Sequence, residues 1–80
     1  MKSNKDFDKT EGTVKVKSKY SINIGNLNVR ENPGRQYSVI GTAVQGPVEI
    51  VEKYDDPDTG IIWGKLAEGG WVDMQYVSEG

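Results

Sequence analysis

The 80-residue sequence predicts an all-β protein, a small antiparallel barrel of short strands. Apolar and polar residues alternate in several short runs, and Gly, Pro, Asn and Asp residues interrupt these runs every few positions. Nowhere do about ten consecutive residues show the apolar spacing of a helix. A chain of this length holds one domain with a small core. We therefore expect about five or six short strands that close into a strongly bent barrel.

Charge separates the first residues from the rest of the chain. Residues 1–19 contain six lysines and three acidic residues, whereas residues 20–80 contain four basic and nine acidic ones. Residues 1–12 mix charges with one aromatic residue, Phe7, and are expected to form a flexible tail before a barrel at residues 13–80. An acidic barrel would repel a phosphate backbone, so nucleic-acid binding is not expected.

Membrane and export signals are not evident in the sequence. No apolar run approaches the roughly 20 residues needed to span a bilayer. The first six residues, MKSNKD, lack the apolar segment of a signal peptide. We expect a soluble chain without membrane insertion, which either acts where it is made or is an excised piece of a longer protein.

The first alternating runs predict a hairpin. Residues 13–17 are expected to form an edge strand, with Val14 and Val16 facing the core and lysines facing solvent. Alternation continues over residues 20–24. The Gly-Asn pair at 25–26 then predicts a hairpin loop before the next strand.

The next strand, LNVR at residues 27–30, leads into a sharply shaped loop. Pro33 disfavours helix at the residue before it and fixes its own φ, and Gly34 can take the positive φ of a type II turn. Loops held on rigid strands commonly carry binding groups. Polar and aromatic residues on or beside this loop are Asn28, Arg30, Asn32, Arg35 and Tyr37.

The second half of the chain reads as further strands separated by turns. Strands are predicted at residues 38–44, 48–54, 61–67 and 71–73, with turns at 45–47, 55–60 and 68–70. If Leu66 faces the core, Ile62 and Gly64 share its face, and Trp63 points to the other side. Residues 74–77 form either a single 3₁₀ turn or a closing strand.

Five pieces of the sequence follow one another in the order and with the gaps of a known family. They are LNVR (27–30) with NPG (32–34), YSVIGT (37–42), Gly46 before VEI (48–50), WGKL (63–66), and GWV (70–72) with YV (76–77). Over residues 27–77 the chain thereby resembles the bacterial SH3 domain family. The resemblance implies an SH3-like barrel. It also implies a place in secreted or surface proteins of bacteria or in phage lysins, often beside a peptidoglycan hydrolase that the domain holds to the cell wall.

Two segments depart from the family's pattern. More residues than usual separate Val16 from Leu27, which predicts an extra hairpin there. The turn at 55–60 is longer and more acidic than the usual one. Both segments lie near possible ligand contacts.

The resemblance, together with the loop, yields a set of candidate ligand-binding residues. Trp63 either lines an aromatic groove or caps the core, and Trp71 more simply packs. Arg30 either binds a ligand carboxylate or ties down its loop, and the Tyr37 ring either contacts ligand or covers the loop. The predicted ligand-binding residues are Asn28, Arg30, Asn32, Tyr37, Trp63 and Tyr76.

Catalytic and metal chemistry find little support in the composition. The chain contains no cysteine and no histidine, which removes a thiolate nucleophile and the usual zinc and copper ligands. Asp55, Asp56 and Asp58 lack the spacing of a calcium-binding EF-hand loop and fit a turn. The glutamates are scattered without a nucleophile to activate. We expect no enzyme activity, cofactor or metal.

The sequence therefore suggests a non-catalytic binding module. The leading hypothesis is a monomeric module that targets a parent cell-wall hydrolase or phage lysin to the peptide of peptidoglycan. Its place would be extracellular, at the cell wall, within a longer secreted or phage-released protein. The alternative is a protein interaction domain that docks an extended or proline-containing peptide segment. A third reading is a structural spacer that binds nothing.

Overall fold

The computed structural model describes residues 13–79. The elements in chain order are β1 (Thr13–Arg30), β2 (Val39–Asp55), β3 (Ile62–Leu66), β4 (Trp71–Asp73), the 3₁₀ helix η1 (Met74–Tyr76) and β5 (Val77–Glu79). The tail predicted at residues 1–12 lies outside the described part of the chain.

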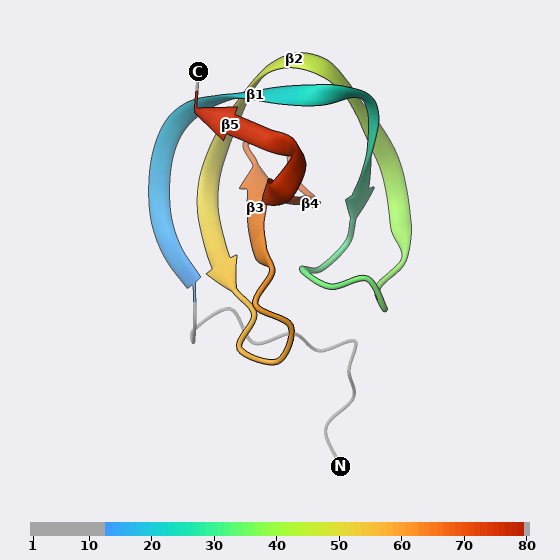
Figure 1. Cartoon of the computed structure of the whole chain (residues 1–80), viewed down its shortest axis with the longest axis vertical. Helices are drawn as coiled ribbons and strands as arrows, with labels where there is room; N and C mark the ends of the chain where they lie inside the picture. Colours follow the sequence, from blue (N-terminus) through green and yellow to red (C-terminus); the bar gives the residue numbers. More distant parts are fainter. Residues whose placement is uncertain (1–12, 80) are drawn as a thin grey trace.

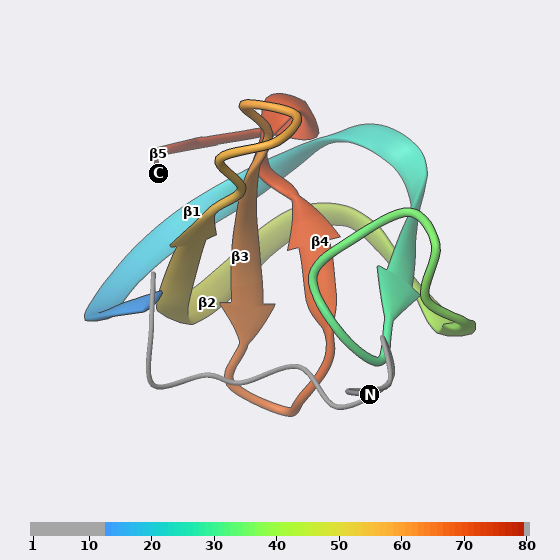
Figure 2. The ribbon, with the colours of Figure 1, turned by 90° about the horizontal axis from the view of Figure 1, so that it is seen from below.

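The five strands form one closed antiparallel sheet. The strand order is β2-β3-β4-β1-β5, and β2 also pairs with β1, which closes the sheet on itself. In Figures 1 and 2 the two long strands curve around the shorter β3 and β4, and β5 crosses one end. The predicted all-β, SH3-like barrel is confirmed.

The first two strands are much longer than predicted. β1 runs through the Gly-Asn pair at 25–26, and β2 runs through residues 45–47, so the predicted hairpin and the predicted break are both wrong. The two segments lie opposite each other, because Ile22 pairs with Gly46 and Asn26 pairs with Val44. Between these pairs β1 has three residues where β2 has one, which is a bulge that bends the strand without reversing it.

This bulge also accounts for the extra residues before Leu27, which form no additional hairpin. Asn23, within the bulge, accepts a hydrogen bond from the Ser78 hydroxyl at 3.3 Å, which joins the bulge to β5. A second irregularity lies between Lys15 and Ser18. It interrupts the alternation there, so Val16 packs against the core while Val14 is 61% exposed, contrary to the prediction for Val14.

The core is a single apolar cluster to which all five strands contribute. Its buried members are Tyr20, Ile22, Leu27, Val29, Ile50, Leu66, Val72 and Val77. Gly64 is buried beside this cluster, and a Cβ there would collide with the Met74 sulfur, so η1 packs directly on the β3 backbone. The small core thus fixes η1 at one end of the barrel.

Candidate functional site

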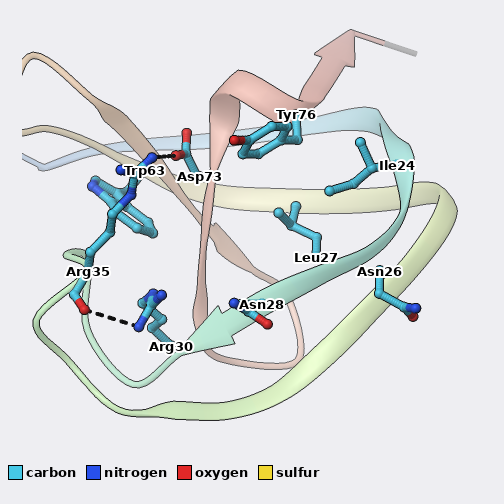
Figure 3. A pocket seen from close by; sticks show the side chains of 9 residues that line it. All are labelled: Ile24, Asn26, Leu27, Asn28, Arg30, Arg35, Trp63, Asp73 and Tyr76. Carbon is cyan, nitrogen blue, oxygen red and sulfur yellow. Dashed lines mark hydrogen bonds and ion pairs between the residues drawn. The ribbon is translucent and has the colours of Figure 1, made fainter.

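A pocket of about 410 Å³ opens between β1, the loop that follows it, β3, and the β4–η1 junction (Figure 3). Four of the six predicted ligand-binding residues line it, and the period-two alternation of β1 places two of these, Asn28 and Arg30, on one face of that strand. The complete lining is Ile24, Asn26, Leu27, Asn28, Arg30, Arg35, Trp63, Asp73 and Tyr76. Tyr76, on η1, is 38% exposed and offers a free ring surface.

Arg30 ties down the loop that forms one wall of this pocket. Its Nη1 donates to the carbonyl of Arg35 at 3.1 Å and to the carbonyl of Tyr37 at 2.9 Å. The hydrogen-bonded turn of this loop runs from Gly34 to Tyr37, whose N–H donates to the Gly34 carbonyl at 3.2 Å. The type II turn predicted around Pro33 and Gly34 is therefore displaced along the chain, and Pro33 is buried.

Trp63 forms the floor of the pocket and is almost fully buried. The residue is 2% exposed although it lies outside the apolar core cluster, so the surrounding loops cover a side chain that points away from Leu66. It also lines a smaller pocket of about 120 Å³ beside the loop at 56–61. Its indole N–H is buried and has no hydrogen-bond partner within residues 13–79. Trp63 thus lines the pocket, yet little of its ring is available for stacking.

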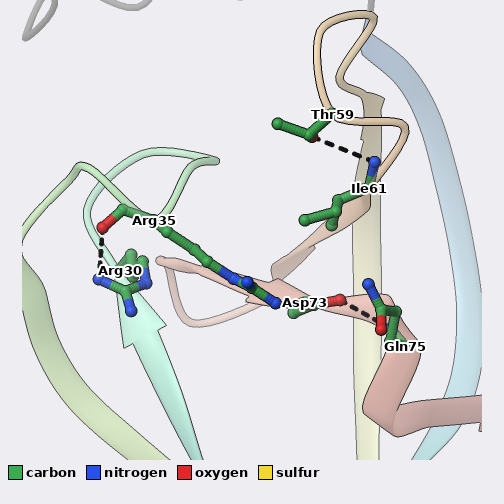
Figure 4. Close-up of polar contacts among 6 residues, drawn as sticks. All are labelled: Arg30, Arg35, Thr59, Ile61, Asp73 and Gln75. Carbon is green, nitrogen blue, oxygen red and sulfur yellow. Dashed lines mark hydrogen bonds and ion pairs between the residues drawn. The ribbon is translucent and has the colours of Figure 1, made fainter.

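Asp73 and Arg35 form an ion pair at the edge of the pocket (Figures 3 and 4). Asp73 Oδ1 accepts the Gln75 N–H at 2.9 Å and so caps η1, while Oδ2 accepts from Arg35 Nη2 at 3.3 Å. The Asp73 side chain is only 7% exposed, whereas the Arg35 side chain is 60% exposed. A buried carboxylate therefore faces an arginine that is largely in solvent.

The two remaining predicted residues do not line the pocket. Asn32 and Tyr37 are both half-buried in the loop, and Tyr37 contributes its carbonyl to Arg30. This contact involves only the Tyr37 backbone, so the two readings of its ring stay predictions.

The sequence profile of the family described as "Bacterial SH3 domain" matches residues 25–78. This chain belongs to that family. Searches of curated proteins and of solved structures returned no significant match. Membership makes the domain a binding module of the SH3 type, a class that binds peptides or proteins. The first part of β1 lies before the matched residues, yet it supplies Tyr20 and Ile22 to the core of this SH3 domain.

The acidic loop of this SH3 domain is a self-contained turn. Asp56 N–H donates to the Ile61 carbonyl at 3.0 Å, and Asp56 Oδ1 accepts the Asp58 N–H at 2.9 Å. Within residues 13–79 no group of three or more Asp, Glu, His or Cys side chains is placed to hold a metal ion. The same part of the chain has no helix long and apolar enough to cross a membrane.

Burial raises the pKa of Tyr54, which precedes the acidic loop, above its ordinary value of 10.0. The negative charges of Asp56 and Asp58, and then Tyr37 and Asp55, raise this pKa further because they disfavour a phenolate nearby. The pKa of Tyr54 therefore depends on both the acidic loop and, through Tyr37, the loop after β1.

Sequence reasoning missed the contribution of Asp73 to the site. One local signal was available, because Asp is a favoured capping residue and precedes the short MQY segment that forms η1. Its pairing with Arg35 joins residues 38 positions apart and has no local signal.

Proposed function

We propose that this SH3 domain binds an extended peptide of bacterial peptidoglycan in the pocket between β1 and η1. The observation that carries the proposal is the pocket itself, which combines the half-exposed ring of Tyr76 with amide side chains in a bacterial SH3 domain. A peptide backbone presents alternating donors and acceptors, which Asn26 and Asn28 can satisfy because both side chains have both functions. Tyr76 offers an apolar face with a polar edge for the peptide's side chains.

Binding of this kind would attach a longer protein to the cell wall. The domain would act outside the cell as a non-catalytic, monomeric part of a cell-wall hydrolase or a phage lysin. This step is supported by the resemblance to a family that occurs in such proteins. The acidic barrel also fits a ligand other than nucleic acid.

Retention on purified wall sacculi tests the proposal. Tyr76→Ala removes the exposed ring, and we expect about fivefold weaker retention, the usual worth of one aromatic contact. Val44→Ala is the matched control, because Val44 is exposed on β2 and does not line the pocket. Trp63 is unsuited to this test because its truncation would leave a cavity. Equal retention of wild type and Tyr76→Ala, or none by the wild type, would contradict the proposal.

Peptide arrays distinguish the runner-up, a domain that docks an extended or proline-containing segment of another protein. Such a domain would bind array peptides through the same pocket and fail to bind sacculi. Tyr76→Ala would then weaken binding to the array peptides, and neither the wild type nor the variant would bind sacculi.

A further inference from the structure

The Asp73 carboxylate is a buried charge with an incomplete ion pair. One of its oxygens caps η1, and the other accepts from Arg35 at 3.3 Å. Hydrogen bonds between ionised groups are commonly about 2.7–2.9 Å long, and arginine often grips a carboxylate with two of them. A carboxylate this buried is costly unless it is well paired. The long bond to Arg35 leaves Asp73 able to gain from a closer cation.

Arg35 is free to leave Asp73 without disturbing its loop. Its backbone carbonyl is held by Arg30 at 3.1 Å, independently of its own side chain. Its guanidinium side chain is 60% exposed and would be hydrated on leaving, so the cost of separating this long pair falls mainly on the buried Asp73, which the incoming cation would pair again. Arg35 and Trp63 line both the large pocket and the smaller one, so a rotation of Arg35 would enlarge the space beside Trp63.

From this geometry we infer that a primary ammonium group of the ligand replaces Arg35 on Asp73. The inference rests on the proposed function, and it names the chemical class of the bound group, the side-chain amine of a diamino acid such as lysine. An ammonium is a compact point charge with three donors, so it can approach Asp73 Oδ2, the oxygen that Arg35 would leave, more closely than a planar guanidinium. The excess of acidic residues over residues 20–80 favours a cationic ligand as it approaches.

Two substitutions test separately the role of Asp73, which would bind the ammonium, and that of Arg35, which the ammonium would replace. Asp73→Asn keeps an acceptor that can cap η1 while it removes the charge. Arg35→Gln removes the competing cation and keeps a polar side chain of similar length. If Asp73 is the receptor, the first change weakens binding and the second strengthens it. The double variant should gain nothing from the loss of Arg35.

The experiment is an NMR titration of the protein with the tetrapeptide Ala-Glu-Lys-Ala and with the same peptide acetylated on the lysine Nε. We expect the free-amine peptide to shift the amide signal of Gln75, whose N–H is bonded to Asp73. Arg35→Gln should bind it about fivefold more tightly, because the Arg35 guanidinium, which is largely in solvent, no longer competes for Asp73. Asp73→Asn should bind it about tenfold more weakly, the usual worth of a hydrogen bond to a charged group. Unchanged amide signals in the turn at 67–70 would show that each variant is folded.

Several results would overturn the inference, and they separate it from the proposed function. Equal affinity for the two peptides, or weaker binding by Arg35→Gln, would show that the lysine ammonium does not replace Arg35. Sacculi that bind through Tyr76 while neither peptide shifts Gln75 would overturn the ammonium site and leave wall binding intact. Failure to bind sacculi and both peptides would overturn both proposals.

Discussion

The two loops that border Trp63 are held in different ways. The loop at 31–38 has two backbone hydrogen bonds of its own, Glu31 N to Ser38 O at 3.0 Å and Tyr37 N to Gly34 O at 3.2 Å. It is also held by a strand side chain, because Arg30 of β1 donates to two of its carbonyls. The loop at 56–61 is closed by its own residues. Its hydrogen bonds are Asp56 N to Ile61 O, Gly60 N to Asp56 O, Asp58 N to Asp56 Oδ1 and Ile61 N to Thr59 Oγ1. One wall of the site therefore relies in part on a side chain of the barrel, whereas the other relies on its own turn residues.

This difference predicts which loop changes shape when a neighbouring side chain is altered. A locally closed turn keeps its shape whatever happens nearby, since each of its bonds joins residues close in sequence. A loop that also relies on a side chain of the neighbouring strand loses part of its shape when that side chain is removed. The loop at 31–38 also carries Arg35, so its backbone must stay fixed for the Arg35 side chain to move alone.

The largest loss of stability should follow removal of the Arg30 hydrogen bonds to the loop at 31–38. Arg30→Met keeps much of the side-chain volume and removes both hydrogen bonds to the loop. We expect the free energy of unfolding to fall by about 2 kcal/mol, because two carbonyls lose a charged donor. Urea denaturation measures this change, and broadened amide signals over residues 31–38 should accompany it.

Arg35→Met is the matched control for that change, because Arg35 is the other arginine of the pocket. Its ion pair with the buried Asp73 is long, at 3.3 Å, and its own side chain is 60% exposed, so we expect a smaller loss of about 1 kcal/mol. Equal losses for the two variants would mean that Arg30 has no special hold on the loop, and the contrast between the loops would fail.

A smaller effect should follow a change in the self-contained loop. Asp56→Ala removes the acceptor for the Asp58 N–H, and we expect a loss of about 1 kcal/mol in the free energy of unfolding. Asp56→Asn keeps an acceptor oxygen and should cost about 0.3 kcal/mol or less. Thermal unfolding of the two variants measures the difference. If Asp56→Asn is as damaging as Asp56→Ala, the carboxylate's charge holds this loop and not its hydrogen bond.

The features that were predictable from the sequence are those that short segments determine. Pro57 and Gly60 within an acidic run specify a turn wherever it occurs, and the Gly69-Gly70 pair supplies the positive φ values of 111° and 88° that its reversal needs. The 3₁₀ turn at 74–76 was one of two predicted alternatives, and its Asp cap is local. These elements depend little on distant partners.

The course of the two long strands was not predictable in this way. A Gly-Asn pair is compatible with both a hairpin loop and a bulge, and only the pairing of β1 with β2 across residues 22–26 and 44–46 decides between them. The burial of Trp63 likewise depends on two loops, one of which, at 31–38, lies far from it in sequence. Alternation indicated the direction of its side chain and could not indicate what covers it.

For the site, the sequence predicted the strand face and missed the charge pairing. Asn28 and Arg30 follow from the alternation of β1, and Trp63 and Tyr76 follow from the family resemblance. Of the two readings of Arg30, the structure supports the one in which it ties down its loop. Arg35 and Asp73 meet only because the loop folds back over β4, a contact that no local pattern encodes.

The subtlest expected effect is a pH dependence that reports on both loops at once. Burial, then Asp56 and Asp58, and then Tyr37 raise the pKa of Tyr54 in the folded protein above its ordinary value of 10.0. The unfolded chain therefore loses this proton first as the pH rises, and it then binds fewer protons than the folded protein. By linkage, the stability contributed by protonated Tyr54 is complete below about pH 10 and is lost as the pH rises through the folded pKa. Tyr54→Phe should lose less stability between about pH 9 and pH 11 than the wild type.

Absorbance of the phenolate, compared between wild type and Tyr54→Phe, isolates this titration from the other three tyrosines. Asp56→Asn should lower the pKa of Tyr54 because a nearby negative charge is removed. Arg30→Met should lower this pKa by less, because releasing the loop at 31–38 displaces Tyr37, whose effect on Tyr54 is weaker than that of Asp56 and Asp58. A larger shift in Arg30→Met than in Asp56→Asn would mean that the loop after β1, by covering Tyr54, controls its environment more than the acidic loop does. The loops at 31–38 and 56–61 would then not be held independently.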